Sequence, residues 1–278
     1  MIPRDYITDW RRQAPWVDDV QIEQDLVISR ALVQIFSQPL LHDALAFRGG
    51  TALYKLHLRP AARYSEDIDL VQIKAEPAGP TIDKLREVLD PWLGEPARNR
   101  SHGRMTLTYR FMSESVPPIR SRLKVETNTR EHFSVYGLAS VPFAVDSPWF
   151  EGQCGIQSYE LDELLGTKLR ALYQRAQGRD LFDLATALES GRANPERIVE
   201  AFSAYMKHGG HAITRQQFEK NLTLKMEDAE FTADISPLLT AGHEWDIATA
   251  AATVSDRLIT LLPDSKNARR RARRSSSA

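Results

Sequence analysis

The chain has 278 residues, of which 42% are hydrophobic and 26% charged, and these proportions are typical of a soluble globular protein with a sizeable core. A single cysteine, Cys154, excludes an internal disulfide and is consistent with a reducing compartment. The N-terminus lacks the basic-then-apolar plan of a signal peptide, and no apolar run is long enough to cross a membrane. We therefore expect a cytoplasmic protein with no membrane partner.

The net charge of −1 hides an uneven distribution. The last thirteen residues, 266–278, contain six basic side chains and no acidic one, so removing these six positive charges from −1 leaves a body of −7. A basic tail on an acidic body is either a contact for a polyanion such as RNA or a solubilising, disordered end. The sequence leaves both interpretations open, and the terminal run of serines favours disorder in either case.

Hydrophobic periodicity divides the chain into an α/β part and a helical part. In chain order it predicts helices within the first forty residues, a strand at 45–48, a short helix at 51–58 capped by Thr51, a strand at 67–73, a helix at 81–89, and strands at 105–111, 122–126 and within 133–143. The β character is expected to stop around Trp149, and the patterns are helical from Leu161 onwards. The expected fold class is α+β, with an α/β domain at 1–155, a helical domain at 156–262 and the basic tail at 263–278.

Two aspartates, Asp67 and Asp69, alternate on the strand that follows Ser65-Glu66. Residues two apart on a strand project from the same face, and aspartate is depleted in strands, so the pair indicates a function. Magnesium is held by a few carboxylate oxygens together with water and substrate phosphates. The alternative is a solvent-facing strand surface without a ligand.

A third carboxylate, Glu126, lies on the face of its strand opposite Leu123 and Val125. If this strand is a neighbour of the strand that carries Asp67 and Asp69, three carboxylates share one sheet surface. They would repel one another unless cations neutralise them, as metal ions do in two-metal nucleotidyl transfer. Strand pairing is not readable from the sequence, so a structural role for Glu126 stays equally open.

Upstream of the aspartates, Gly49-Gly50-Thr51 forms the turn between a strand and a helix. Glycine is needed at such a turn for backbone reasons alone, but the turn also offers backbone N–H groups to a phosphate. Thr51, Arg63 and Ser65 complete the predicted nucleotide site, Ser65 because the two-residue period places it on the face of the aspartates. The alternative for Arg63 is that it is an ordinary surface residue that does not contact phosphate.

A second informative stretch begins at Leu161, where apolar residues recur at helical spacing. Lys168 falls inside this apolar stripe, so it either extends its amine to solvent or meets an anion, a triphosphate or a site carboxylate. Gly178 is expected to end this helix. Asp180 is then either an N-terminal cap of the next helix, with Asp183 in its first turn, or a cleft residue that acts as a general base or positions Lys168.

These blocks together resemble the AbiEii/AbiGii toxin family. The resemblance is carried by five segments, at 47–53, 63–70, 124–126, 162–175 and 178–184. It implies a nucleotidyltransferase core of the DNA polymerase β type, a mixed sheet flanked by helices, followed by a C-terminal helical domain. It also implies that Asp67 and Asp69 hold metal, that Lys168 binds triphosphate and that Asp180 is catalytic.

The resemblance further implies a toxin of a bacterial toxin–antitoxin or phage-defence system, with a cognate antitoxin as a partner. Related MenT toxins transfer nucleotides to the 3′ end of tRNA. We therefore expect a Mg²⁺-dependent transferase that moves a nucleoside monophosphate from an NTP to RNA, with tRNA as the acceptor. The alternatives are a small-molecule or protein hydroxyl as the acceptor, and a non-catalytic nucleotide-binding regulator.

Overall fold

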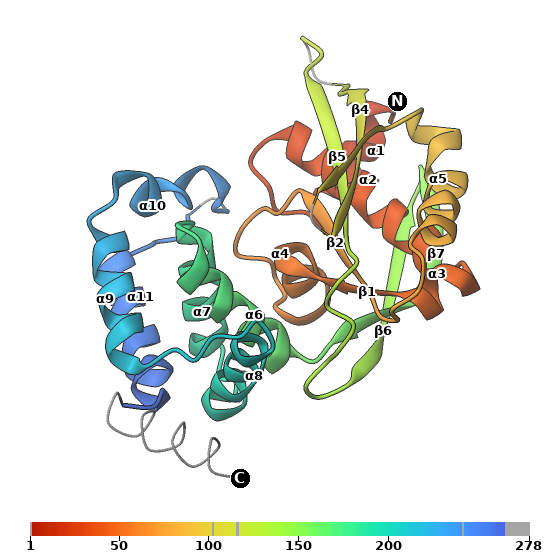
Figure 1. Cartoon of the computed structure of the whole chain (residues 1–278). Coiled ribbons are helices and arrows are strands. Elements are labelled where there is room, and N and C mark those ends of the chain that lie inside the picture. Colours follow the sequence, from red (N-terminus) through yellow and green to blue (C-terminus); the bar gives the residue numbers. More distant parts are fainter. Residues whose placement is uncertain (1, 102, 115–116, 241, 265–278) are drawn as a thin grey trace. The chain divides into compact units, whose positions relative to one another are not determined.

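The computed structural model describes residues 2–101, 103–114, 117–240 and 242–264 (Figure 1). Two compact units make up the chain: the first comprises residues 1–160 with 240–243, and the second comprises 161–239 with the residues from 244 onwards. Most of the predicted basic tail, residues 265–278, lies outside the described residues. No helix of the described residues is long and apolar enough to cross a membrane.

The first unit is built on one seven-stranded sheet with the order β3-β4-β5-β2-β1-β7-β6. Its strands are β1 (Leu45–Arg48), β2 (Asp67–Gln72), β3 (Ala97–Ser101), β4 (Arg104–Met112), β5 (Arg120–Asn128), β6 (Leu138–Ser147) and β7 (Phe150–Tyr159). The β2–β5 and β1–β7 pairs are parallel and the other pairs are antiparallel. The sheet is therefore mixed, as predicted.

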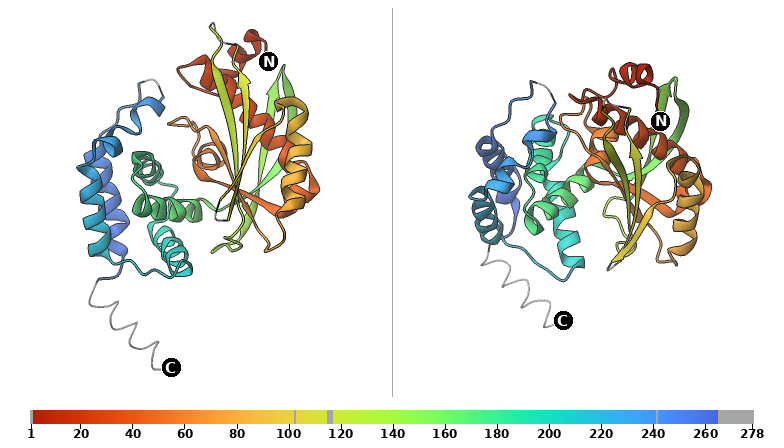
Figure 2. Two further views of the ribbon diagram at one scale, coloured as in Figure 1. Left: turned by 45° about the horizontal axis from the view of Figure 1, so that its top comes forward. Right: turned by 90° about the horizontal axis from the view of Figure 1, so that it is seen from above.

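Helices α2 and α5 pack side by side against this sheet, and Figure 2 shows them from two further sides. The helices of this unit are α1 (Arg4–Trp10), α2 (Asp19–Phe36), α3 (Pro39–Ala44), α4 (Gly49–Ala52), the π-helical turn η1 (Leu53–His57) and α5 (Gly79–Leu93). The Arg30 guanidinium of α2 lies 4.2 Å from the ring centre of Trp92 on α5 and 4.6 Å from that of Trp149. This cation–π contact ties the two helices to the β6–β7 hairpin.

The two faces of the sheet differ in chemistry because the strands alternate. Leu107 of β4 lies opposite Val125 of β5, and both are buried. The same face carries Tyr109, whose hydroxyl donates a 2.8 Å hydrogen bond to Asp90 of α5. The opposite face of β2, β5 and β4 carries polar and charged residues, with Asp67 and Asp69 among them.

The described part of the second unit is helical. It contains α6 (Leu161–Gln174), α7 (Gly178–Glu189), α8 (Pro195–His208), α9 (Arg215–Met226), α10 (Ala229–Ala233), η2 (Ser236–Leu238), α11 (Ile247–Arg257) and η3 (Ile259–Leu261). Its core includes the buried rings of Phe182, Phe202 and Phe218. Side-chain caps start α8 and α9, at Asn194 and in a capping box at Thr214.

Three sequence predictions were wrong, and one strand, β3, was not predicted. The β character does not stop near Trp149, because β7 pairs with β6 along ten residues although its glycines and lack of alternation concealed it. The edge strand β3 is exposed throughout and so has no apolar pattern to detect. Helix α4 begins at Gly49 with Arg48 at its N-cap, so Thr51 is not the cap. Gly178 begins α7 instead of ending α6, and a Cβ at this position would lie 2.2 Å from the carbonyl oxygen of Phe231.

Candidate active site

The carboxylate strand β2 lies at the centre of the sheet between β1 and β5. The pairing that the sequence left open is a parallel one, in which Asp67 lies opposite Lys124 and Asp69 lies opposite Glu126. On the other side, Arg48 of β1 lies opposite Asp69. Residues that are opposite in register point to the same face of a sheet. Three carboxylates and two cations therefore share this face of the sheet.

The charges on this face are unevenly matched. Lys124 Nζ lies 3.0 Å from Glu126 Oε2 but 3.8 Å from Asp67 Oδ2, and Arg104 lies 3.1 Å from Glu126 Oε1. Both oxygens of Glu126 thus face cations. Burial raises the pKa of Asp67 to about 6; Lys124 opposes this shift and the neighbouring Asp69 adds to it. Burial therefore makes Asp67 harder to ionise than an exposed aspartate, and a cation bound beside it would favour its ionised form.

Asp67 and Asp69 fit a divalent cation. In the part of the chain that the structure describes, no three His, Cys, Asp or Glu side chains are gathered as a complete metal site. Magnesium does not need one, because it binds through one or two carboxylates together with water and substrate phosphates. The third carboxylate, Glu126, is committed to Arg104 and Lys124 in this structure, and its role as a ligand stays a prediction.

The glycine turn is pressed against the aspartate strand. Gly49 has a φ of +84°, and a Cβ added to it would lie 2.1 Å from Asp69 Oδ2. A Cβ on Gly50 would lie 2.5 Å from the Arg63 guanidinium and 3.1 Å from Ser65 Oγ. Gly49 is therefore required by close approach and by its backbone conformation, whereas a side chain at position 50 would displace the end of the Arg63 side chain. The turn, Arg63, Ser65 and Asp69 form one local cluster.

Thr51 joins this cluster through its hydroxyl group. Thr51 Oγ1 donates to the carbonyl oxygen of Asp67 at 2.6 Å and lies 2.9 Å from Ser65 Oγ. The contact fixes the start of β2 against α4. The surface interpretation of Arg63 was wrong, because this residue is only 2% exposed, donates to the carbonyl of Tyr64 and lies 5.2 Å from the ring centre of Tyr54.

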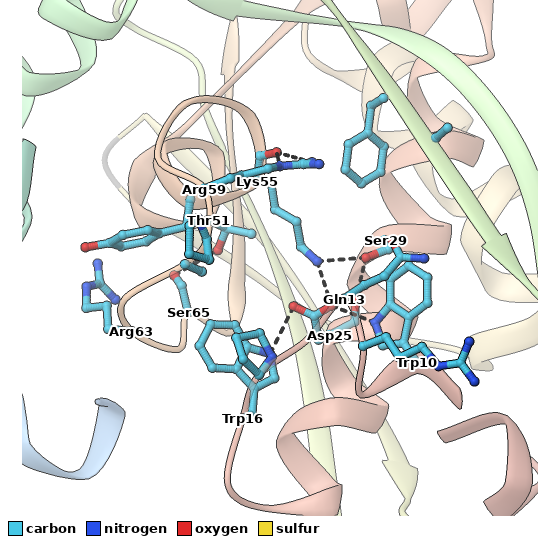
Figure 3. Close-up of a pocket in the computed structure, with 17 residues that line it drawn as sticks. Trp10, Gln13, Trp16, Asp25, Ser29, Thr51, Lys55, Arg59, Arg63 and Ser65 are labelled. Carbon is cyan, nitrogen blue, oxygen red and sulfur yellow. Dashed lines mark hydrogen bonds and ion pairs between the residues drawn. The ribbon is translucent and has the colours of Figure 1, made fainter. Parts of the chain in front are cut away.

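A pocket of about 290 Å³ lies beside the glycine turn, and Thr51, Arg63 and Ser65 contribute to its lining (Figure 3). In its wall, Lys55 Nζ donates to Asp25 Oδ1 at 2.7 Å and to Ser29 Oγ at 2.8 Å. Asp25 also accepts hydrogen bonds from the indole N–H groups of Trp10, at 2.8 Å, and Trp16, at 3.2 Å. Burial lowers the pKa of Lys55, and Asp25 opposes that shift. This network lines the same pocket as Thr51, Arg63 and Ser65 of the glycine-turn cluster.

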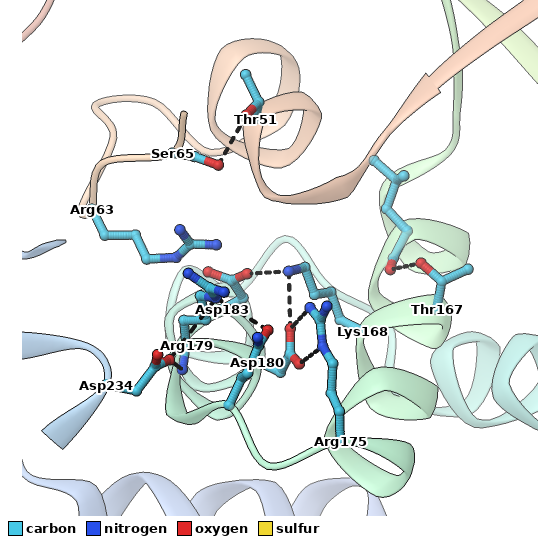
Figure 4. A network of polar contacts seen from close by, with 12 residues as sticks. Thr51, Arg63, Ser65, Thr167, Lys168, Arg175, Arg179, Asp180, Asp183 and Asp234 are labelled. Carbon is cyan, nitrogen blue, oxygen red and sulfur yellow. Dashed lines mark hydrogen bonds and ion pairs between the residues drawn. The ribbon is translucent and has the colours of Figure 1, made fainter. Parts of the chain in front are cut away.

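The second cluster surrounds Lys168 in the helical unit (Figure 4). Lys168 Nζ lies 3.1 Å from Asp180 Oδ1 and 2.8 Å from Asp183 Oδ2. Arg175 donates two hydrogen bonds to Asp180, at 2.7 and 2.9 Å. Both aspartate side chains are fully buried. The interpretation in which Lys168 extends its amine to solvent was therefore wrong. Of the two kinds of anion predicted as its partner, a triphosphate or a site carboxylate, the structure shows carboxylates.

These contacts also decide between the interpretations of Asp180. Pure helix capping was wrong, because Gln177 occupies the N-cap of α7 and the Asp180 carboxylate binds Lys168 and Arg175. Burial raises the pKa of Asp180, but these two cations outweigh burial and hold the pKa below its usual value. A carboxylate with a low pKa and occupied oxygens is a weak general base and a good positioning group.

The sequence matches the AbiEii family, described as a nucleotidyl transferase toxin of a type IV toxin–antitoxin system, over residues 30–253. The chain belongs to this family. It is therefore a nucleotidyltransferase enzyme, as the sequence predicted. No curated protein is similar enough in sequence to be matched.

Solved structures support the AbiEii assignment at the level of the fold. MenT4, a nucleotidyltransferase toxin from Mycobacterium tuberculosis, aligns with a TM-score of 0.61 at 18% identity, covering 97% of this chain and 93% of its own. JHP933 from Helicobacter pylori aligns with a TM-score of 0.55 at 15% identity, covering 94% and 98%. A putative nucleotidyltransferase from H. pylori gives 0.53 at 15% identity, covering 88% and 95%. The predicted nucleotidyltransferase fold is confirmed.

Sequence reasoning missed one charged pair of this AbiEii protein. Arg48 donates to Glu131 at 2.6 Å, and this contact raises the pKa of Arg48 against the opposing effect of burial. Arg48 directly precedes the glycine turn, so its place in that segment was the available signal. Glu131 gave none, since it lies in an irregular stretch after β5.

Proposed function

We propose that this AbiEii-family enzyme transfers a nucleoside monophosphate from an NTP to the 3′ end of an RNA, with tRNA as the acceptor. The acceptor hydroxyl attacks the α-phosphorus, a new P–O bond forms, and pyrophosphate leaves. Membership of a nucleotidyltransferase toxin family supports the reaction class. An antitoxin that neutralises the enzyme and a role in phage defence belong to the same proposal.

In this proposal Asp67 and Asp69 hold Mg²⁺, which when bound spreads the negative charge of the reacting phosphates. The aspartates fit this role because the pKa of Asp67 is raised to about 6 by burial and like charge, and a cation relieves that repulsion. Glu126 keeps Lys124 and Arg104 beside the aspartates and becomes a ligand only if it leaves them.

The glycine turn and its partners bind the triphosphate in this proposal. Thr51 and Ser65 offer hydroxyl groups next to the start of β2, and Arg63 offers a guanidinium held against Gly50. Gly49 and Gly50 leave the backbone accessible because neither carries a Cβ. The contact that carries the proposal most directly is the packing of Gly49 on Asp69, since it joins the phosphate-binding turn to the metal-binding strand within one unit.

Lys168 supplies a positive charge for the triphosphate, and Asp180 positions it. Arg175, whose side chain is half exposed, neutralises Asp180 through two hydrogen bonds, and two cations and two carboxylates make up the charge-balanced set: Lys168, Arg175, Asp180 and Asp183. The Lys168 cluster belongs to the second unit, and the aspartate strand belongs to the first.

The test is transfer of label from each of four α-labelled NTPs to tRNA in the presence of Mg²⁺. We expect one or more nucleotides to label the tRNA, and Asp69→Ala to abolish the labelling while the variant stays folded. Labelling of a protein or a small molecule instead of RNA would keep the enzyme class and change the acceptor. Absence of transfer with all four NTPs would contradict the proposal.

A further inference from the structure

On β4 and β5, the sheet face that carries Asp67 and Asp69 is strongly basic. Five cationic side chains project from it, at alternate positions of two neighbouring strands: Arg104 and Arg110 on β4, and Arg120, Arg122 and Lys124 on β5. We name this set the basic sheet face. All of it lies within the first unit, and its innermost member, Lys124, is directly opposite Asp67 in the register.

Acidic neighbours neutralise only part of the basic sheet face. Arg104 and Lys124 pair with Glu126, and Arg122 lies 3.9 Å from Glu66. The two remaining members, Arg110 and Arg120, are exposed and have no carboxylate within 4 Å among the described residues. The face therefore keeps a surplus of positive charge beside an acidic site.

The strand register makes this surplus costly. Arg110 lies directly opposite Arg122 across the antiparallel β4–β5 pair. Like charges that are directly opposite on a sheet destabilise it, and a local rule is broken in this way chiefly where a ligand compensates. An external polyanion would compensate, because its phosphates would lie between the two guanidinium groups.

We propose that the basic sheet face is the docking surface for the phosphodiester backbone of the acceptor RNA. This inference rests on the proposed function, since it names the surface that brings an RNA end to the aspartates. Members two residues apart on a strand lie about 6.7 Å apart, and neighbouring strands about 4.8 Å apart. By the strand register, the backbone of Arg110 therefore lies roughly 12 Å from that of Asp67, and the backbone of Arg104 roughly 12 Å from that of Asp69, which suits an RNA strand whose end must reach the site.

The face contacts phosphates and does not distinguish bases. The other residues of β4 and β5 on this face carry no aromatic ring on which a base could stack; they are Thr106, Thr108, Met112, Glu126 and Asn128. Contacts to phosphate fix register and orientation and carry no sequence information. The choice of a particular RNA must then come from other parts of the protein.

The chain offers a matched control on the neighbouring strand. Arg98 and Arg100 of β3 lie opposite Leu107 and Met105, which places them on the other side of the same sheet. Both are exposed. Neutralising Arg98 and Arg100 removes the same charge from the protein as neutralising Arg110 and Arg120, without touching the basic sheet face.

The test compares the double variants Arg110→Gln/Arg120→Gln and Arg98→Gln/Arg100→Gln of the full chain, with fluorescein-labelled tRNA as the probe in an anisotropy titration. We expect the first variant to reduce the slope of log affinity against log salt by about 1.4 to 1.8, because each lost phosphate contact contributes 0.7 to 0.9. At 0.1 M salt this corresponds to a loss of affinity of about 25- to 60-fold. The control variant should bind as the wild type does.

Equal losses in the two variants would overturn the inference, since bulk charge would then explain binding, and so would wild-type affinity in the first variant. Thermal melting checks that both variants fold, and the first should melt no lower than the wild type because it relieves repulsion. The two proposals fail separately. RNA binding that depends on Arg110 without transfer of nucleotide would contradict only the proposed function, whereas transfer to tRNA that is unaffected in the first variant would contradict only the docking surface.

Discussion

The backbone of Gly49 occupies the space directly against the Asp69 carboxylate, where a Cβ at position 49 would lie 2.1 Å from Asp69 Oδ2. The contact joins the turn after β1 to the strand β2. It means that the position of this carboxylate depends on a residue without a side chain, and that the turn proposed to bind phosphate and the strand proposed to bind metal are packed together.

The substitution Gly49→Ala is therefore expected to abolish nucleotide transfer, because the new methyl group displaces Asp69. The matched control is Gly191→Ala, since Gly191 also has a positive φ, of +69°, but has open space around its Cα. The control should lose about 1 to 2 kcal/mol of stability from backbone strain alone and keep its activity. Transfer assays and denaturant unfolding of both variants decide this, and an active Gly49→Ala variant would contradict the assigned packing.

Metal binding should depend on the aspartate pair. A variant Asp69→Asn is expected to bind Mn²⁺, in the presence of a non-hydrolysable NTP, more than about 100-fold more weakly than the wild type. The reason is that mutation of residues that only hydrogen-bond to a metal ligand already lowers metal affinity by about 10- to 100-fold. Glu126→Gln should cost less than tenfold if Arg104 and Lys124 keep this carboxylate out of the metal shell. Electron paramagnetic resonance of bound Mn²⁺ measures both, and equal losses would place Glu126 among the ligands.

The buried Lys168 cluster should contribute to folding as well as to activity. Lys168→Met leaves Asp180 and Asp183 fully buried beside each other without their shared cation, and breaking such a set typically costs about 3 to 5 kcal/mol. Lys220→Met, on an exposed position of α9, is the control and should change stability by less than about 0.5 kcal/mol. Urea unfolding measures the difference, and equal stability of the two variants would contradict the buried network.

A pH dependence of stability is expected from Glu23, a buried acid of α2 that accepts a hydrogen bond from the backbone of Glu114. Burial raises its pKa from 4.5 to about 7 in the folded protein. The folded state thus keeps the proton longer than the unfolded state, so this group lowers stability progressively as the pH rises from 4.5 to 7.

Glu23→Gln should accordingly stabilise the protein above pH 7 by up to about 3 kcal/mol and have no such effect below pH 4.5. The exposed Glu151→Gln serves as the control and should be neutral across this range. Thermal melting at several pH values measures both. A stabilisation by Glu23→Gln that does not vary with pH would show that the charge on Glu23 is not its cause.

The sequence predicted those parts of the structure whose signal is local. Alternation located β4 and β5 and placed Glu126 on the face opposite Leu123 and Val125, and the aspartates marked β2. Strand pairing is a long-range property, so it took the structure to place Glu126 beside Asp69. The strand β7 escaped prediction because its ladders to β6 and β1, and not its own residues, make it a strand.

In the candidate site, too, local signals were readable from the sequence and long-range contacts were not. A lysine in an apolar stripe indicated a buried anion, but its partners Asp180 and Asp183 lie on the following helix, and only the packing of α6 on α7 brings them to Lys168. The contact between Arg63 and Gly50 is likewise invisible in the sequence, since a lone arginine in a loop has the pattern of a surface residue.

The measurement that tests the account most directly is the intact mass of tRNA after incubation with the enzyme, Mg²⁺ and the four NTPs. We predict that the tRNA gains the mass of one or more nucleoside monophosphates, that chelation of Mg²⁺ prevents the gain, and that Asp69→Asn prevents it in a folded variant. An unchanged tRNA mass with the wild-type enzyme, or the same gain with Asp69→Asn, would contradict the account.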